Sequence, residues 1–193
     1  MPRHAFPWWV HYLFENRLRR LFQRPERILA PYIGPGSRCL DVGCGLGFFT
    51  LPMARMVRPT GKVLAVDVDE RLLEELKGSA KAEGLDSAIR TVLSPIEELS
   101  SAGPFDFVNC MWSMHETDDP AEAARRIADR LAPGGRILVA EPRWHVSAGD
   151  FEDAVRRFVD AGLLRHGEPP VGLSRAALLA RPSTCAAGPS RPE

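Results

Sequence analysis

The 193-residue sequence predicts an α/β fold with a doubly wound, mostly parallel sheet of seven strands. From Arg38 onward, short apolar runs alternate with longer amphipathic segments, which is the pattern of strands and covering helices. Apolar residues make up 45% of the chain and charged residues 26%, as in globular proteins with a sizeable core. A single domain is therefore expected.

The predicted elements follow in chain order. Apolar residues at helical spacing predict two amino-terminal helices, at 8–24 and 26–33, broken around Pro25. Strands are predicted at 38–42, 62–68, 89–93, 105–112 and 136–142, and helices at 48–57, 70–84, 119–131 and 148–162. Residues 163–181 predict a final antiparallel hairpin. We divide the chain into a helical cap (1–35), a main domain (36–181) and a flexible tail (182–193).

Charge and cysteine usage narrow the class of protein. The formal net charge is zero, so nothing global indicates nucleic acid, although residues 1–38 hold seven arginines against two glutamates. That local excess is either a solvated helix face or a basic surface for an anionic partner. The four cysteines form no CxxC pair, so no metal site is expected. With no secretory signal and no apolar run of about 20 residues, we expect a cytoplasmic protein.

The first predicted strand runs into the sequence DVGCGLGFF, in which three glycines occupy alternate positions. A strand, a glycine turn and a helix together place backbone N–H groups around a ligand at the positive helix end. Gly43 and Gly45 permit a tight turn and close backbone approach, and Gly47 lets the helix pack close to the strand. We therefore expect a ligand at this turn.

The chemistry of the turn distinguishes between ligands. Its spacing is GxGxG, whereas a dinucleotide needs GxGxxG so that the third glycine clears a pyrophosphate. Asp41, just before the glycines, opposes a pyrophosphate but suits a cationic amine. The second strand ends in Asp67, placed for ribose hydroxyls, with Val68 beside it to pack on adenine. S-adenosylmethionine carries both an ammonium group and a nucleoside, and it fits these requirements.

With these motifs the sequence resembles class I S-adenosylmethionine-dependent methyltransferases, in the branch of quinone-biosynthesis and small-molecule enzymes. The resemblance covers residues 36–141 and rests on LDVGCGLGFFTLPMA, VLAVDVDERLLEELK, FDFVNCMWSMHETDDP and LAPGGRILVAEP, in that order. It implies a Rossmann-like fold. It also implies that Asp41 orients the methionyl end, directly or through water, and that Gly43 and Gly45 contact it. Asp67 would bind both ribose hydroxyls, and the Met111 carbonyl would accept a hydrogen bond from the ammonium.

The segment LSPIEELS departs from that family pattern, because many relatives have an aspartate after the third strand to bind the adenine amino group. Pro95 occupies that position here. The N–H of Ile96 is the expected ring contact, with Ser94 or Glu97 in place of the acid.

Methyl transfer from a sulfonium is an in-line displacement, so the enzyme aligns donor and acceptor and supplies a base only where the acceptor must lose a proton. The site is expected at the carboxyl ends of the strands. Side chains that follow the fourth and fifth strands there include Trp112, Met114, His115 and Glu116, then Glu141, Arg143, Trp144 and His145. His115 is the candidate base, because an ordinary histidine titrates near neutrality, and packing of the next turn is its alternative role. Candidate acceptor contacts are Trp112, Glu116, Arg143 and His145.

An aromatic cluster near the amino terminus has three interpretations. Phe6, Trp8, Trp9, Tyr12 and Phe14 could belong to a docked helix, to a lid over the acceptor pocket, or to a segment at a membrane interface. Trp8 and Trp9 are further candidate acceptor contacts.

The predicted function is S-adenosylmethionine-dependent methylation of a small-molecule acceptor. The alternatives are an NAD-dependent oxidoreductase and a catalytically silent S-adenosylmethionine-binding protein. A nucleic-acid partner is not expected, because we find neither an NPPY-type tetrapeptide nor an added basic domain. The sequence does not indicate the acceptor or the oligomeric state.

Overall fold

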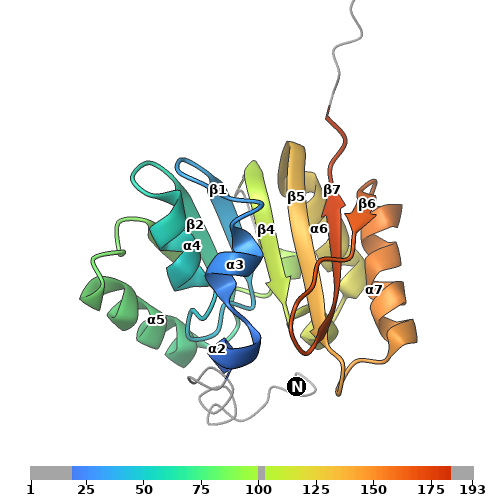
Figure 1. The fold of residues 1–193 in the computed structure, drawn as a ribbon, viewed down its shortest axis with the longest axis horizontal. Coiled ribbons are helices and arrows are strands. Elements are labelled where there is room, and N and C mark those ends of the chain that lie inside the picture. The colour runs from blue at the N-terminus through green and yellow to red at the C-terminus, as the bar shows by residue number, and fades with distance from the viewer. Residues whose placement is uncertain (1–18, 100–102, 184–193) are drawn as a thin grey trace, which may run out of the picture.

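The computed structural model describes residues 19–99 and 103–183, and these form one seven-stranded sheet with the strand order β3-β2-β1-β4-β5-β7-β6. The strands are β1 (Arg38–Val42), β2 (Lys62–Asp67), β3 (Ile89–Leu93), β4 (Phe105–Met111), β5 (Leu131–Pro142), β6 (Leu164–Gly167) and β7 (Ser174–Ala180). The first five strands are parallel, and β7 is antiparallel to both β5 and β6. The predicted fold, including its antiparallel carboxyl-terminal hairpin, is confirmed (Figure 1).

Helices cover both faces of this sheet. They are α2 (Arg19–Phe22), α3 (Pro25–Leu29), α4 (Thr50–Val57), α5 (Glu70–Ala82), α6 (Pro120–Arg130) and α7 (Ala148–Asp160), with 3₁₀ turns η1 (Ile96–Glu98) and η2 (Met114–Glu116). In Figure 1, α3 and α4 lie on the near face and α6 on the far face. Asp69, Asp119 and Ser147 cap α5, α6 and α7 by accepting backbone N–H bonds of the first turn.

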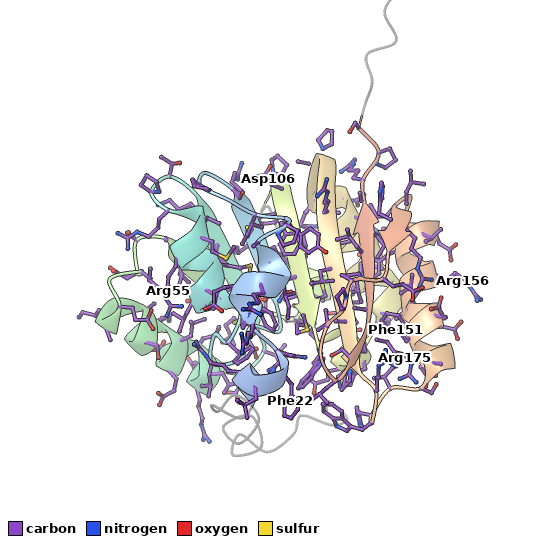
Figure 2. All side chains as sticks on the ribbon, in the orientation of Figure 1. Phe22, Arg55, Asp106, Phe151, Arg156 and Arg175 are labelled. Carbon is purple, nitrogen blue, oxygen red and sulfur yellow. The ribbon has the colours of Figure 1, made fainter. Side chains whose placement is uncertain are left out.

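Successive side chains of each strand point to opposite faces of the sheet, so each face has its own apolar core. Leu40 and Val42 pack with α6 and α7, whereas Cys39 packs with α3 and α4. Phe151 of α7 is 2% exposed and lies between that helix and the sheet, whereas Arg156 points away into solvent (Figure 2). The central strands are buried on both faces, which explains why β1, β2, β4 and the second half of β5 appear in the sequence as near-continuous apolar runs.

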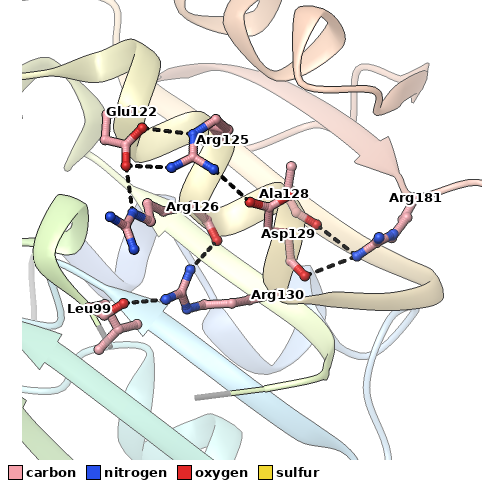
Figure 3. Close-up of polar contacts among 8 residues, drawn as sticks. All are labelled: Leu99, Glu122, Arg125, Arg126, Ala128, Asp129, Arg130 and Arg181. Atoms are coloured by element: carbon pink, nitrogen blue, oxygen red, sulfur yellow. Dashed lines mark hydrogen bonds and ion pairs between the residues drawn. The ribbon is translucent and has the colours of Figure 1, made fainter. Parts of the chain in front are cut away.

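The far end of the sheet is held to α6 through backbone carbonyls. Arg130 donates to the carbonyl oxygens of Leu99 and Arg126, and so ties the segment after η1 to this helix (Figure 3). Arg181, just after β7, donates to carbonyls at the end of α6 at 3.2 and 3.0 Å. The carboxyl ends of β1, β4 and β5 lie at the opposite end of the strands. In an open α/β sheet, that end is where ligands bind.

Some boundaries differ from the predicted ones. β5 begins at Leu131 because that residue already pairs with Phe105, five residues before the predicted start. α4 begins at Thr50, since the glycine turn extends through Phe49. Of the predicted helix 8–24, residues 19–24 are described, and α2 covers the first four of them. The rest of that helix lies outside the described residues, as does most of the predicted tail. Among residues 19–99 and 103–183, no helix is long and apolar enough to span a bilayer.

Candidate functional site

The glycine turn between β1 and α4 has the conformation that its sequence requires. Gly43, Gly45 and Gly47 have φ values of +66°, +52° and +91°, which other residues rarely adopt. A Cβ on Gly43 would lie 2.6 Å from Cβ of Ser113, and one on Gly47 would overlap Leu76 of α5. The third glycine therefore permits close packing of α5, rather than of α4 as expected, and the first permits close approach of the segment after β4.

Asp41 is a buried acid directly before this turn, with only 2% of its surface exposed. It lies opposite Asn109 in the β1–β4 pairing, and Asn109 Nδ2 donates to Asp41 Oδ1 at 2.8 Å. Thr50 donates to Oδ2 at 2.5 Å. Burial raises the pKa of the Asp41 carboxyl to about 6, although these two hydrogen bonds and the charge of Arg19 oppose the shift. Both oxygens thus have protein donors, which favours an indirect effect on a ligand.

Two buried polar atoms beside this acid have no hydrogen-bond partner among the described residues, Asn109 Oδ1 and Ser113 Oγ. Ser113 is 7% exposed and is the residue that packs on Gly43. Buried polar atoms without partners are costly and are rare in native proteins. A hydrogen-bonding ligand at the turn would satisfy them, so these residues fit the amino-acid end of S-adenosylmethionine.

Asp67 ends β2 and faces the same turn. Its Oδ2 accepts the Gly45 N–H at 2.8 Å, and its Oδ1 accepts the Asp69 N–H at 3.0 Å. Each carboxylate oxygen has a second lone pair, so both can still accept a hydroxyl hydrogen bond. Val68 is 66% exposed, which leaves an apolar side chain uncovered beside the acid. The pair therefore has the chemistry that a nucleoside needs.

The segment after β3 supplies backbone groups near this acid. Ser94 N–H donates to the Asp67 carbonyl at 3.0 Å, and Ser94 Oγ donates to the Pro95 carbonyl. The Ile96 side chain is buried in the core, while its N–H begins η1, where a first-turn donor has no partner within the turn. The contact between the Ile96 N–H and the adenine ring stays a prediction.

The end of β4 forms an aromatic wall of the site. Met111 is the last strand residue, paired with Ala140, and Trp112 follows it with a φ of +63°. A left-handed conformation is uncommon for a residue other than glycine and is often found at functional sites. The Trp112 indole donates to Ser174 Oγ at 2.8 Å and packs edge-on against Trp144, with ring centroids 5.0 Å apart.

Arg19 of α2 brings a positive charge to this wall. Its guanidinium carbon lies 4.0 Å from the Trp112 ring centre and 4.4 Å from that of Phe48. Its Nε donates to Gln23 Oε1 at 2.9 Å, and the fully buried Gln23 donates to the Gly172 carbonyl at 2.8 Å. In Figure 1, α2 lies at the end of the sheet where β4 and β5 have their carboxyl ends. The amino-terminal part of the chain therefore contributes directly to the site.

His115 in η2 is paired with a buried acid of β5. Its Nδ1 lies 2.6 Å from Oε2 of Glu141, whose side chain is 1% exposed. Burial alone would lower the pKa of His115, but the hydrogen bond and charge of Glu141, with the charge of Glu116, outweigh it and raise the pKa. For Glu116, burial raises the carboxyl pKa. This histidine is thus partly buried and has a fixed hydrogen-bond partner.

A hollow of about 300 Å³ opens beside this histidine. Its lining comes from η2, the start of α6, the end of β5 with the segment after it, and α7, and it includes His115, Glu141, His145, Asp150, Asp153 and Arg157. The rings of His115 and His145 pack edge to face at 4.9 Å. Arg143 instead donates from Nε to the Ser174 carbonyl at 2.9 Å, which ties it to β7. Trp8 and Trp9 lie outside the described residues.

A family profile described as "Methyltransferase domain" matches residues 9–168. The chain belongs to the class I S-adenosylmethionine-dependent methyltransferases. A ubiquinone biosynthesis O-methyltransferase of Caulobacter sp. (strain K31) is 36% identical over 140 residues, which are 72% of this chain and 53% of the relative. This methyltransferase-family chain thus spans about half the length of the curated relatives it matches.

Solved structures support the same fold. A SAM-dependent methyltransferase from Aquifex aeolicus has a TM-score of 0.79 at 20% identity, covering 91% of this chain and 98% of the other. The N-methyltransferase NodS from Bradyrhizobium japonicum WM9, solved with S-adenosyl-L-homocysteine, has a TM-score of 0.70 at 20% identity, covering 89% and 91%. At such identities the likeness concerns the fold. Across the described parts of this methyltransferase-family chain, no group of His, Cys, Asp and Glu could hold a metal ion.

Several residues of the site were not predicted as site residues. Arg19, Asn109 and Ser113 belong to this group, whereas Glu141 was expected at this end of the sheet without a stated role. A polar residue inside an otherwise apolar strand was the available signal for Asn109 and Glu141. Arg19 had no comparable signal, because it is one of seven arginines in residues 1–38.

Proposed function

We propose that this chain binds S-adenosylmethionine at the glycine turn and transfers its methyl group to a small-molecule acceptor. The observation that carries the proposal is the turn itself, with Gly43 packed on the unpartnered Ser113 and Gly45 bonded to Asp67. Such a site offers a buried acid, free acceptor atoms and a ribose-binding carboxylate, and it has no arrangement suited to a pyrophosphate.

Each part of the cofactor has a residue to hold it. Asp67 would accept both ribose hydroxyls, with Val68 against the adenine and the Ile96 N–H at the ring edge. The ammonium would lie near Ser113 and the Met111 carbonyl, in the field of the buried Asp41. The guanidinium of Arg19 is suited to the carboxylate at the methionyl end.

His115 is the proposed base for an acceptor that must lose a proton. S-adenosylmethionine supplies the methyl group on a sulfonium, and its sulfur leaves as a neutral thioether. The acceptor forms the new bond to carbon and gives its proton to Nε2 of His115, since Nδ1 is bonded to Glu141. We place the acceptor at the 300 Å³ hollow beside His115, whose size suits a small molecule. The O-methyltransferase names of the curated relatives favour a hydroxyl acceptor.

Cofactor identity is tested by calorimetry with S-adenosylmethionine and with NAD. We expect binding of the first only, and Asp67→Ala should lose about 2 kcal/mol or more of binding free energy, because charge-assisted hydrogen bonds are removed. A thermal melt without ligand controls for the loss of the Gly45 contact. Tighter NAD binding, or unchanged affinity in the variant, would refute the assignment.

Turnover is tested by screening acceptor classes and measuring S-adenosylhomocysteine formation. With a hydroxyl acceptor, His115→Ala should lower kcat by about 10²-fold or more, and the wild-type rate should rise with pH through the raised pKa of His115. Binding without turnover on any acceptor would favour the catalytically silent alternative. Full turnover per folded molecule in the variant would assign His115 to packing of the turn.

A further inference from the structure

Glu141 is a buried acid whose carboxylate, among residues 19–99 and 103–183, is bonded to one short segment. Its side chain is 1% exposed at the end of β5. Oε1 accepts the backbone N–H groups of Met114 at 2.9 Å and His115 at 3.2 Å. Oε2 lies 2.6 Å from His115 Nδ1. Burying a charge is costly unless it is fully bonded, so this acid and η2 are fixed relative to each other.

The protonation of His115 follows from this contact. A carboxylate is only an acceptor, so the ring nitrogen facing it must carry the proton. In the neutral imidazole, the proton is then on Nδ1 and the lone pair is on Nε2. When Nε2 takes a second proton, the negative charge of Glu141 stabilises the resulting imidazolium.

The other ring nitrogen lies near a second acid. His115 Nε2 lies 3.9 Å from Oε1 of Glu116, and the charge of Asp67 in turn acts on Glu116. Other titratable or charged groups around the ring come from further elements: His145 after β5, and Asp150, Asp153 and Arg157 of α7 on the same hollow. Of these groups, Glu141 is the one bonded to Nδ1.

We propose that Glu141 is the positioning residue of His115, whose carboxylate fixes the ring orientation and the tautomer that leaves Nε2 able to accept a proton. The inference rests on the proposed role of His115 as the base. It assigns to Glu141 no contact with substrate or cofactor. Its effect is exerted through the histidine.

A substitution of glutamine for Glu141 tests the roles of the two carboxylate oxygens separately. In Glu141→Gln, the amide oxygen can still accept the two backbone N–H groups, which preserves η2. The amide NH₂ then faces Nδ1 and favours the opposite tautomer, with the proton on Nε2. The pKa of His115 should fall, because the negative charge and the accepting oxygen are both removed.

Nitrogen-15 NMR of the histidine rings tests the proposal on the apo protein, without any acceptor. We expect the Nδ1–H tautomer in the wild type, the Nε2–H tautomer in Glu141→Gln, and a lower His115 pKa in the variant. The matched control is Glu152→Gln, a surface acid paired with Arg165, which should leave the His115 signals unchanged. An Nε2–H tautomer in the wild type would overturn the proposal even if Glu141→Gln failed to fold.

Turnover then distinguishes this proposal from the proposed function. Where a hydroxyl acceptor has been found, Glu141→Gln should lower kcat by about 10²-fold or more and leave the Kd for S-adenosylmethionine within about twofold. Its rate–pH profile should move with the His115 pKa. The predicted tautomers in a protein without methyl transfer would refute the proposed function alone. Unchanged tautomer and pKa in a folded Glu141→Gln would refute the role of Glu141 alone.

Discussion

Asp41 combines full burial with a carboxyl pKa of about 6, well above its ordinary value of 3.8. The folded protein therefore binds this proton more tightly than the unfolded chain does. Its contribution to stability is largest at acidic pH and is lost as the pH rises through about 6. Above that value, the buried charge is retained at a cost in stability, which we attribute to its value for a cationic ligand.

Asp41→Asn removes that charge and should change stability in a pH-dependent way. Compared with wild type, the variant should be more stable at pH 8, where the wild type carries the buried charge, than at pH 5, where it does not. Its affinity for S-adenosylmethionine at pH 7.5 should fall by about tenfold, because the attraction between the buried negative charge and the ammonium group is lost. Urea unfolding at both pH values and calorimetry measure these effects. A stability loss of equal size at both pH values would make Asp41 a structural residue.

Arg19 can be tested by changing the ligand as well as the protein. We expect Arg19→Ala to weaken S-adenosylmethionine binding by about tenfold or more, because a guanidinium–carboxylate pair is lost. Decarboxylated S-adenosylmethionine should bind wild type and variant equally. Arg20→Ala, at the neighbouring exposed arginine of α2, is the control. Equal losses with both ligands would show that Arg19 supports the aromatic wall and does not bind the carboxylate.

At the scale of elements, the position of α2 depends on one glycine. A Cβ at Gly172 would overlap the backbone carbonyl of Phe22, and backbone cannot move aside as a side chain can. Gly172→Ala should therefore displace α2, expose Gln23 and weaken cofactor binding about as much as Arg19→Ala. Gly167→Ala is the matched control, because an added Cβ there meets nothing within 4 Å. Calorimetry and proteolysis at α2 report the effect; unchanged affinity in Gly172→Ala would separate α2 docking from the site.

The order of helices and strands was predictable, because the spacing of apolar residues is a local property of the chain. The ends of the strands were less predictable. β5 extends back to Leu131 through LAPGG, which has no strand pattern, because pairing with Phe105 supplies the hydrogen bonds. Contacts such as His115–Glu141 and Asp41–Asn109 join residues of different elements, and they depend on a strand order and register that one sequence does not specify. The cofactor motifs were predictable because they lie within short continuous segments.

For the whole molecule, the amino-terminal residues raise the next question. Deleting residues 1–16 should preserve S-adenosylmethionine binding and abolish methyl transfer, if the aromatic segment closes the acceptor pocket against water. Calorimetry and turnover of the truncated protein measure the two effects. An interfacial segment predicts the opposite result for a soluble acceptor analogue, with turnover kept and binding to anionic vesicles lost. Salt-sensitive vesicle binding that disappears on truncation would establish that alternative.

The hydrogen bond from Gln23 to Gly172 spans 149 positions of the chain. In an unfolded chain, closing so long a loop carries a large entropic cost, which grows with the logarithm of loop length. Once the sheet exists, β7 is already beside β5, and the loop still to be closed is the short connection from Gln23 to β1. We expect α2 to dock after the sheet forms and to undock without global unfolding. Amide hydrogen exchange in α2 should then be faster than in β4, and it should slow when S-adenosylmethionine is added. The same undocking of α2 would open the site and let the ligand enter.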